Sequence, residues 1–459
     1  MRLNRGIRTL KINISCDQAT LWSLARYIIS VATGPLIIVA IARRFTPELQ
    51  GYYYTFNSII AFQVLFELGF STCITQIVSH EFAQLSWTKE NVIEGDEIAL
   101  DRLKAVANLA LKWYTVGALA LFILLGVAGE FIFSNRQIEI TWRLQWWLLS
   151  GGTALAFLAL PFTAILNGSG QIPWVSKATI IQNLVRACVL IALIFFGGSL
   201  YSPGLASISA ALVLIALLVG RWSHLLRQIC GNELSRAIDF NWYREIWPFQ
   251  WRLAVSWISG CLVFSSFTPL LFVQSGAIEA GKFGITWSVL QAITGLSQVF
   301  ITAKQPEFGV LLAKKQFSQL KRNWSRASIQ SIAMIITLLL LGVVALEFME
   351  RYHVMRARFL GWGSVMPLMV GITFSQIIAC VTALARADKK EPFVWLTLVG
   401  SMVIGFGNFI WVRQYGTGGL AWNYCVITVL STMMVLSMLH NIRPFSMNPF
   451  DKTKITSEI

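Results

Sequence analysis

The chain has 459 residues, of which 56% are hydrophobic and only 13% charged, and its mean hydropathy is +0.63. Soluble proteins average about 45–50% apolar and about 25% charged residues. The composition therefore excludes an ordinary soluble enzyme, a disordered chain and a coiled coil, and it indicates one polytopic membrane protein. The net charge of +15 also raises nucleic-acid binding, so the positions of the cations have to decide between these classes.

Twelve stretches are apolar and long enough to cross a bilayer, for which a helix needs roughly 20 mainly apolar residues. In chain order they are 20–42, 52–80, 105–128, 145–166, 175–197, 205–222, 249–273, 283–303, 327–347, 363–385, 393–412 and 419–440. We therefore predict an all-α integral membrane protein with twelve transmembrane helices.

The lysines and arginines fix the orientation of these spans, because such residues are retained on the cytoplasmic side of a membrane. If the N-terminus lies inside, most of the cations outside the spans fall on the inner side, which also holds the longest loops, 81–104, 223–248 and 304–326. Both termini are thus predicted to be cytoplasmic. The positive net charge follows from topology, and we expect no nucleic-acid partner.

The loop at 223–248 divides the chain into an N-terminal six-helix lobe (1–222) and a C-terminal six-helix lobe with a cytoplasmic tail (249–459). Residues 241–248 mix aromatic and charged side chains, which suits either a segment lying in the membrane interface or a plain linker. A faint repeat supports two halves, since an acid, a glycine and an aromatic residue follow both the first and the seventh span. These residues are Glu48, Gly51 and Tyr52, and Glu279, Gly281 and Phe283.

Polar residues line one face of the first two spans of each half, at spacings of mostly three or four residues that place them on the same side of a helix. They are Ser23, Arg26, Ser30 and Thr33; Gln63, Glu67, Ser71 and Thr75; Arg252, Ser256, Ser259 and Ser266; and Gln291, Thr294, Gln298 and Thr302. The four stripes predict a wet central cavity between two six-helix bundles. For any single hydroxyl, helix packing is the alternative.

Four cations inside the spans are candidates for binding an anionic group that arrives from the cytoplasm: Arg26, Lys112, Arg186 and Arg252. All four are predicted to lie in the inner half of the membrane. An arginine can bind phosphate through two hydrogen bonds, whereas a lysine acts as a point charge. The alternative is that these side chains extend to the cytoplasmic headgroups.

Glu67 is the only acid deep inside a predicted span, and charged groups at such depth generally mark a functional pathway. It can pair with one of the cations, or it can couple transport to H⁺ or Na⁺. Pro35 interrupts the first span, where it predicts either a hinge or a static kink.

The seven cysteines and four histidines are scattered through the chain. The cysteines form no closely spaced pair of the kind that metal sites and redox centres use. We therefore expect no metal, no cofactor and no catalytic residues.

The run from Ile41 to Tyr54, followed by Phe66–Ser71, resembles the first helical hairpin of the polysaccharide-unit (O-antigen, Wzx-like) flippases. This family belongs to the MOP (multidrug/oligosaccharidyl-lipid/polysaccharide) exporter superfamily. The shared pattern is a span, a loop with Pro47, Glu48, Gly51 and Tyr53, and an acid followed by an apolar residue and glycine. The glycine-containing loop at 167–170 is also similar. Glu67 stands where the family more usually has aspartate.

The resemblance implies two six-helix bundles around a central cavity, in a bacterial inner membrane. It also implies a substrate, an undecaprenyl-pyrophosphate-linked oligosaccharide that is moved from the inner to the outer leaflet for O-antigen, capsule or exopolysaccharide assembly. A polysaccharide polymerase and a chain-length regulator are the partners that such a pathway implies. The cavity cations would then contact the pyrophosphate.

Two alternatives remain open on the sequence. A cation-coupled multidrug exporter of the same fold would favour acids in the cavity, whereas the spans carry one acid and several cations. A membrane glycan polymerase or ligase would usually need a large external loop, and the outer loops at 129–144 and 348–362 are short. We therefore predict a flippase, not an enzyme.

Overall fold

The computed structural model describes residues 18–88, 90–134, 140–230, 247–313, 315–351, 356–387 and 393–438. Apart from one short β-hairpin, the secondary structure in these residues is helical, which confirms the predicted all-α class. Nine of the described helices are long and apolar enough to span a membrane, and one bent helix pair makes a tenth span.

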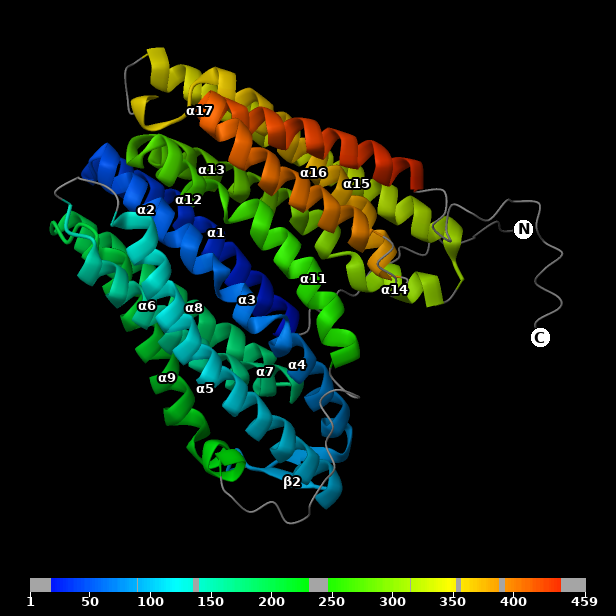
Figure 1. Cartoon of the computed structure of the whole chain (residues 1–459). Coiled ribbons are helices and arrows are strands. Elements are labelled where there is room, and N and C mark those ends of the chain that lie inside the picture. The colour runs from blue at the N-terminus through cyan, green and yellow to red at the C-terminus, as the bar shows by residue number, and fades with distance from the viewer. Residues whose placement is uncertain are drawn as a thin grey trace, which may run out of the picture.

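The N-terminal lobe comprises the helices up to α9 (Figure 1). Its elements are α1 (Gln18–Arg44), α2 (Pro47–Ile60), η1 (Ala61–Gln63), α3 (Val64–Glu67), α4 (Phe70–Glu81), η2 (Phe82–Gln84), β1 (Leu85–Trp87), β2 (Ile93–Gly95), α5 (Glu97–Phe133), α6 (Arg143–Leu158), α7 (Leu160–Gly168), α8 (Ile172–Phe195) and α9 (Tyr201–Cys230). Within this lobe α8 packs against both α1 and α9, and α6 packs against α5 and α9.

The C-terminal lobe lies beside it and starts at α11 (Figure 1). Its elements are α11 (Trp247–Phe264), α12 (Phe267–Ser275), α13 (Ala277–Thr302), α14 (Gln305–Ala313), α15 (Phe317–Arg351), η3 (Arg356–Arg358), α16 (Trp362–Ala387) and α17 (Val394–Met438). Here α17 packs against α11, α12 and α16, while α13 packs against α12, α15 and α16.

The second and seventh predicted spans are broken, and the last two share one helical element. The second bends by 43° between α3 and α4, where Leu68 and Gly69 adopt left-handed backbone angles with φ of 47° and 71°. The seventh divides into α11 and α12. Helix α17 contains both of the last two predicted spans, because the chain turns back at Gly416 (φ 57°), where glycine accepts a positive φ without steric cost. Over its described residues, each of the twelve predicted spans therefore corresponds mainly to a helix or to consecutive helical segments.

The two lobes touch most closely where α2 meets α13. The amide nitrogen of Gly51 would lie 2.8 Å from a Cβ atom placed on Gly281, and a Cβ atom on Gly51 would overlap the carbonyl oxygen of Ala277. The Gln50 side chain donates a hydrogen bond of 2.8 Å to the Gly281 carbonyl. The glycines of the two repeated motifs therefore face each other and allow two backbones to meet.

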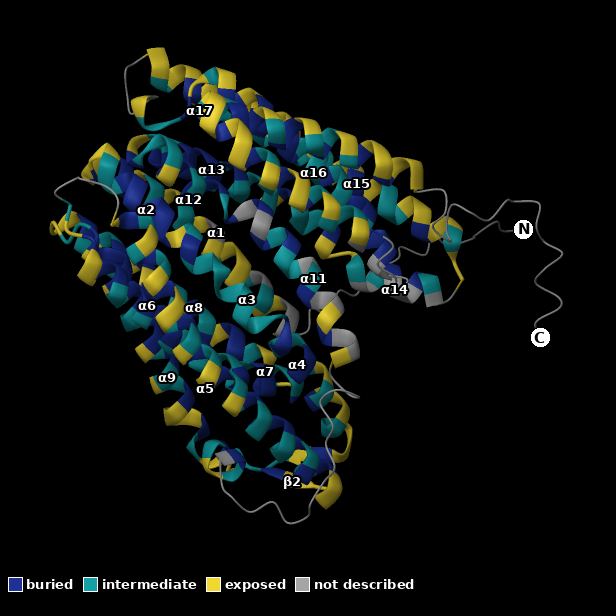
Figure 2. Ribbon diagram, in the orientation of Figure 1, coloured by how far each residue is buried: buried dark blue, intermediate teal, exposed yellow. Residues whose placement is uncertain are grey.

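Many large apolar residues are exposed on both lobes, and Figure 2 shows exposed positions along the outer helices. Phe406 on α17, for example, is 75% exposed. Such faces suit a lipid environment, in which apolar surface needs no protein cover.

Several predictions fall outside the described residues. These are the cytoplasmic placement of the two termini (1–17 and 439–459), most of the linker at 223–248, and nearly all of the proposed interfacial segment at 241–248. Helix α9 continues to Cys230, so the first residues of the predicted linker are helical.

Candidate functional site

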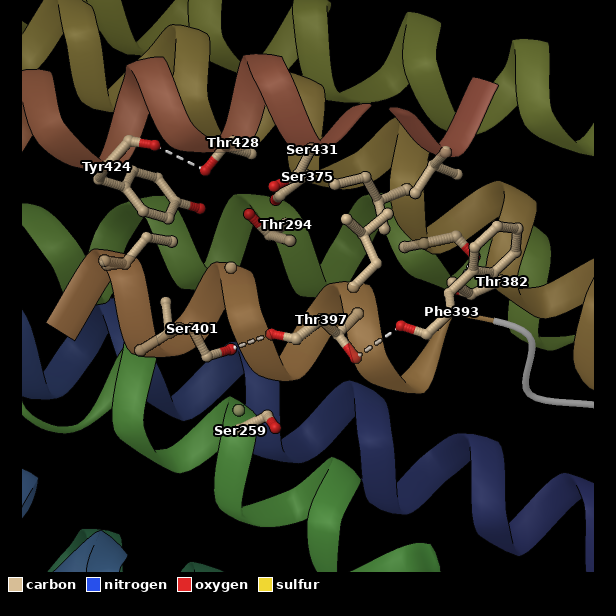
Figure 3. Close-up of a pocket in the computed structure, with 18 of the residues that line it drawn as sticks. Ser259, Thr294, Ser375, Thr382, Phe393, Thr397, Ser401, Tyr424, Thr428 and Ser431 are labelled. Carbon is tan, nitrogen blue, oxygen red and sulfur yellow. Dashed lines mark hydrogen bonds between the residues drawn. The ribbon is translucent and has the colours of Figure 1, made fainter. Parts of the chain in front are cut away.

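The C-terminal lobe encloses a cavity of about 450 Å³ between α11, α13, α16 and α17. Among the described residues, no Asp, Glu, Lys or Arg lines it. Its polar lining consists of hydroxyl and amide side chains, most of which are seen in Figure 3: Ser259, Gln291, Thr294, Gln298, Ser375, Thr382, Thr397, Ser401, Tyr424, Thr428 and Ser431. Gly295 lies opposite Tyr27 of α1, so this cavity reaches the boundary between the lobes.

Many of these hydroxyl groups donate their proton to the preceding helical turn, as Thr294 does to Leu290 O (2.9 Å) and Thr428 to Tyr424 O (2.7 Å). Their oxygen lone pairs remain available as acceptors towards the cavity. The side chains of Gln291 and Gln298 make no hydrogen bond to the described residues, and each supplies both a donor and an acceptor. The cavity therefore suits an uncharged, polyhydroxylated ligand.

The N-terminal lobe contains a second cavity, of about 270 Å³, between α1, α2, α6, α8 and α9. Arg186 is the only charged residue in the part of its lining that the structure describes. The neutral polar groups there include Ser30, which was predicted, and Asn57 and Asn183, which were not. Asn183 precedes Arg186 by three residues, a spacing that places both on one face of α8. This spacing is the sequence signal by which Asn183 could have been found.

The predicted cavity residues thus divide between two sites. Ser30 lines the N-terminal cavity, whereas Gln291 and Gln298 line the C-terminal one. Ser23 faces α8, where its hydroxyl lies 3.5 Å from that of Ser176.

The four candidate cations are placed differently from one another. Arg186 is exposed and lies past the midpoint of α8, rather than near the end at which α8 begins; it shares its cavity with Leu149 and Thr153 of α6 and with the first turns of α9. Arg26 and Lys112 are exposed and line neither cavity. Arg26 is one turn from Ser30 on the same face of α1. Arg252 and Ser256 are carried by α11, but their side chains lie outside the described residues.

Glu67 ends α3 at the bend in the second span, and its carboxylate accepts a hydrogen bond from the Ser71 hydroxyl. Among the described residues no lysine or arginine lies within ion-pair distance of Glu67, so Arg26, Lys112 and Arg186 are not its partners. Gln63 is half-buried in η1 just before this bend. Pro35 is exposed within α1, which continues as a helix on both sides of it.

An apolar groove of about 1090 Å³ lies at the junction of the lobes. Phe62 and Ile132 contribute from the N-terminal lobe, and α12 and α17 supply the remaining lining. Ser401 lines both this groove and the hydroxyl-rich cavity. The hydroxyl-rich cavity and the apolar groove therefore adjoin each other on α17.

No family model matches the sequence, and no curated protein matches it. Solved structures do resemble the fold. A multidrug resistance MATE family transporter of the MOP superfamily, in an inward-facing conformation, is 11% identical with a TM-score of 0.66, covering 93% of this chain and all of that one. The MATE multidrug transporter DinF-BH in complex with R6G is 14% identical with a TM-score of 0.58, covering 98% and 100%.

The lipid II flippase MurJ in an inward closed conformation is 16% identical with a TM-score of 0.55, covering 93% of this chain and 89% of that one. These similarities extend over nearly the whole length of each protein. The chain therefore has the same fold as these transporters, and its many apolar helices make it a multi-pass membrane protein.

Proposed function

We propose that the protein is a flippase for undecaprenyl-pyrophosphate-linked oligosaccharides, moving them from the cytoplasmic to the outer leaflet of a bacterial inner membrane by alternating access. The products would serve O-antigen, capsule or exopolysaccharide assembly, with a polymerase and a chain-length regulator acting next. No covalent bond is broken. The likeness to a lipid II flippase supports a lipid-linked substrate for this fold.

The observation that carries the proposal is the contact between a charge-free hydroxyl cavity and an apolar groove at Ser401. Sugars present many hydroxyl groups and no charge, and they are bound by side chains such as Gln291 and Gln298. A polyprenyl chain is purely hydrocarbon and suits the groove lined by Phe62 and Leu270. The two sites together suit an amphiphile with a glycan at one end and a lipid at the other.

The pyrophosphate requires cations, and neither of these two parts supplies one among the described residues. Arg26 on α1 and Arg252 on α11 are our candidates, since each lies in the first half of a first span of its lobe. Arginine binds phosphate oxygens with two parallel hydrogen bonds. Lys112, exposed on α5, can add a point charge, whereas Arg186 belongs to a separate cavity.

A cation-coupled multidrug exporter is the second candidate, because a MATE transporter of this fold binds R6G. A site for cationic drugs would be expected to contain carboxylates. No Asp or Glu lines either polar cavity in the described part of the chain, which favours the flippase.

Glu67 is the candidate for ion coupling. It lies at a break in a membrane helix, where freed backbone groups and a carboxylate can bind a proton or Na⁺. Its hydrogen bond to Ser71 would change on protonation, because the carboxylate then becomes a donor.

Deletion of the gene tests this function in the native cell. We expect undecaprenyl-linked oligosaccharide to accumulate and surface glycan to disappear, and the wild-type gene to reverse both effects. Arg26→Ala and Arg252→Ala should reach the membrane at normal levels without restoring export, whereas Arg43→Ala, a change at the other end of α1, should restore it. Normal glycan export in the deletion strain would refute the proposal.

A further inference from the structure

The described lining of the N-terminal cavity contains one cation and no acid. Across the five helices that form it, α1, α2, α6, α8 and α9, Glu48 is the only Asp or Glu. Glu48 lies in the first turn of α2 and does not line the cavity. The helices around Arg186 therefore contain no carboxylate that could neutralise it within the membrane.

Three donor groups in this cavity make no hydrogen bond to the described residues: the Arg186 guanidinium, the Asn183 amide and the Ser207 hydroxyl. Asn183 and Arg186 come from α8, and Ser207 comes from the facing helix α9. An arginine at membrane depth is expensive unless a counter-charge accompanies it. Neutral donors around a single cation form the surroundings that an anion requires.

We infer that this cavity is a binding site for a small inorganic monovalent anion of the chloride class, held by Arg186 and by the amide and hydroxyl donors of Asn183 and Ser207. One negative charge balances the one cation in the described lining. The volume of about 270 Å³ is below the roughly 300–1,000 Å³ of typical ligand pockets, so a sugar-bearing pyrophosphate does not fit. The site is thus distinct from the one proposed for the transported lipid.

The position of the cavity gives anion binding a structural consequence. Tyr53 and Asn57 of α2 face the cavity, while Gly51 and Tyr54 of the same helix contact α13 in the other lobe. An anion bound between α8 and α2 fixes the helix through which the two lobes meet. Its occupancy therefore stabilises the folded protein in this arrangement of the lobes.

The test uses the purified full-length protein in detergent, first exchanged into gluconate and then titrated with chloride at constant ionic strength. We expect the thermal unfolding temperature of the wild type to rise and to saturate, and radioactive chloride to bind saturably. Arg186→Gln should lose both responses. Arg44→Gln should retain them, since the Arg44 guanidinium lies 5.0 Å from the centroid of the Phe195 ring, outside the cavity.

Asn183→Leu provides a second variant that keeps the charge, and it should weaken chloride binding without abolishing it. Equal chloride responses in the wild type and in Arg186→Gln would overturn the inference. So would a response of the wild type to inorganic pyrophosphate but not to chloride, which would assign Arg186 to a phosphate ligand. The test contains no lipid-linked substrate, so its failure would leave the proposed flippase activity standing. Failure of the flippase proposal would likewise leave the anion site standing.

Discussion

The two lobes provide polar cavities of opposite character. In the N-terminal lobe the described lining carries one guanidinium, and the five surrounding helices contain one acid, at an end of α2. In the C-terminal lobe the described lining is rich in hydroxyl and amide groups and contains no charge. Two halves that begin with a similar motif have therefore become chemically different. In our proposals an inorganic anion binds in the N-terminal lobe and uncharged sugars bind in the C-terminal lobe.

The boundary between the lobes is, by contrast, nearly symmetric, because Gly51 and Gly281 occupy equivalent places in the two halves.

Substituting Gly51 with alanine should have a larger effect than any change at a cavity or a kink. Its Cβ would overlap the backbone of Ala277, and backbone cannot move aside as a side chain can. We expect about 1–3 kcal/mol of destabilisation, seen as a lower unfolding temperature, together with loss of export. Gly342→Ala in α15 is the control, since a Cβ there meets nothing within 4 Å; equal effects of both changes would show that the close contact is not the cause.

Glu67→Gln addresses the one acid deep within the spans of the N-terminal lobe. Glutamine retains an acceptor for the Ser71 hydroxyl but cannot take up a proton or neutralise Na⁺. We expect export to lose its response to an imposed H⁺ or Na⁺ gradient while the protein remains folded. The measurement is glycan-lipid flipping in vesicles with and without a gradient. Glu130→Gln, which breaks an outer ion pair with Arg143 (2.7 Å), should keep the response; the same loss there would show that the effect is not specific to Glu67.

Gln298→Leu tests the neutral side of the comparison. The change removes an amide that contacts the substrate in our proposal and leaves the lobe packed. A hydrogen bond contributes about 0.5–1.5 kcal/mol, so the apparent affinity for the glycan-lipid should fall by roughly two- to tenfold. Titration of the glycan-lipid in a flipping assay measures this. Gln316→Leu, at an exposed position outside the cavity, should leave the affinity unchanged, and an unaffected Gln298→Leu would separate this cavity from the substrate.

Pro35→Ala should have the smallest effect. Proline 35 lies next to the residues of α1 that line the N-terminal cavity, and alanine would restore one helical hydrogen bond. If Pro35 is a hinge, flipping slows while the unfolding temperature is unchanged or higher. An unchanged flipping rate in the same vesicle assay would identify a static kink. Gly34→Ala, for which a Cβ meets no atom within 4 Å, is the matched control.

The fold was largely predictable from the sequence, because membrane spans depend mainly on the length and hydropathy of each segment. The breaks were not. Leu68 adopts a positive φ, which is unusual for a bulky residue, and nothing in its apolar neighbourhood predicts this. The hairpin of β1 and β2 was also missed, since its strands have three residues each and are held by Gln228, distant in sequence, which bonds both the N–H and the carbonyl of Ile93.

The site was predictable only in part, for a geometric reason. A spacing of three or four shows which residues share a helix face, but it does not show which neighbouring helix that face meets. Three residues of the stripe on α13, Gln291, Thr294 and Gln298, do line a cavity. The stripes on α1 and α13 were expected to meet in one space, whereas Ser30 faces α8 and α9 within its own lobe.

The most direct test of the central claim is reconstitution of the purified protein into liposomes, with one assay for each rival substrate. We predict that undecaprenyl-pyrophosphate-linked oligosaccharide becomes accessible on the opposite leaflet at a rate that depends on the protein and that falls in Arg26→Ala. The cationic dye R6G should not be transported. Transport of R6G without movement of the glycan-lipid would contradict the flippase and establish the multidrug exporter in its place.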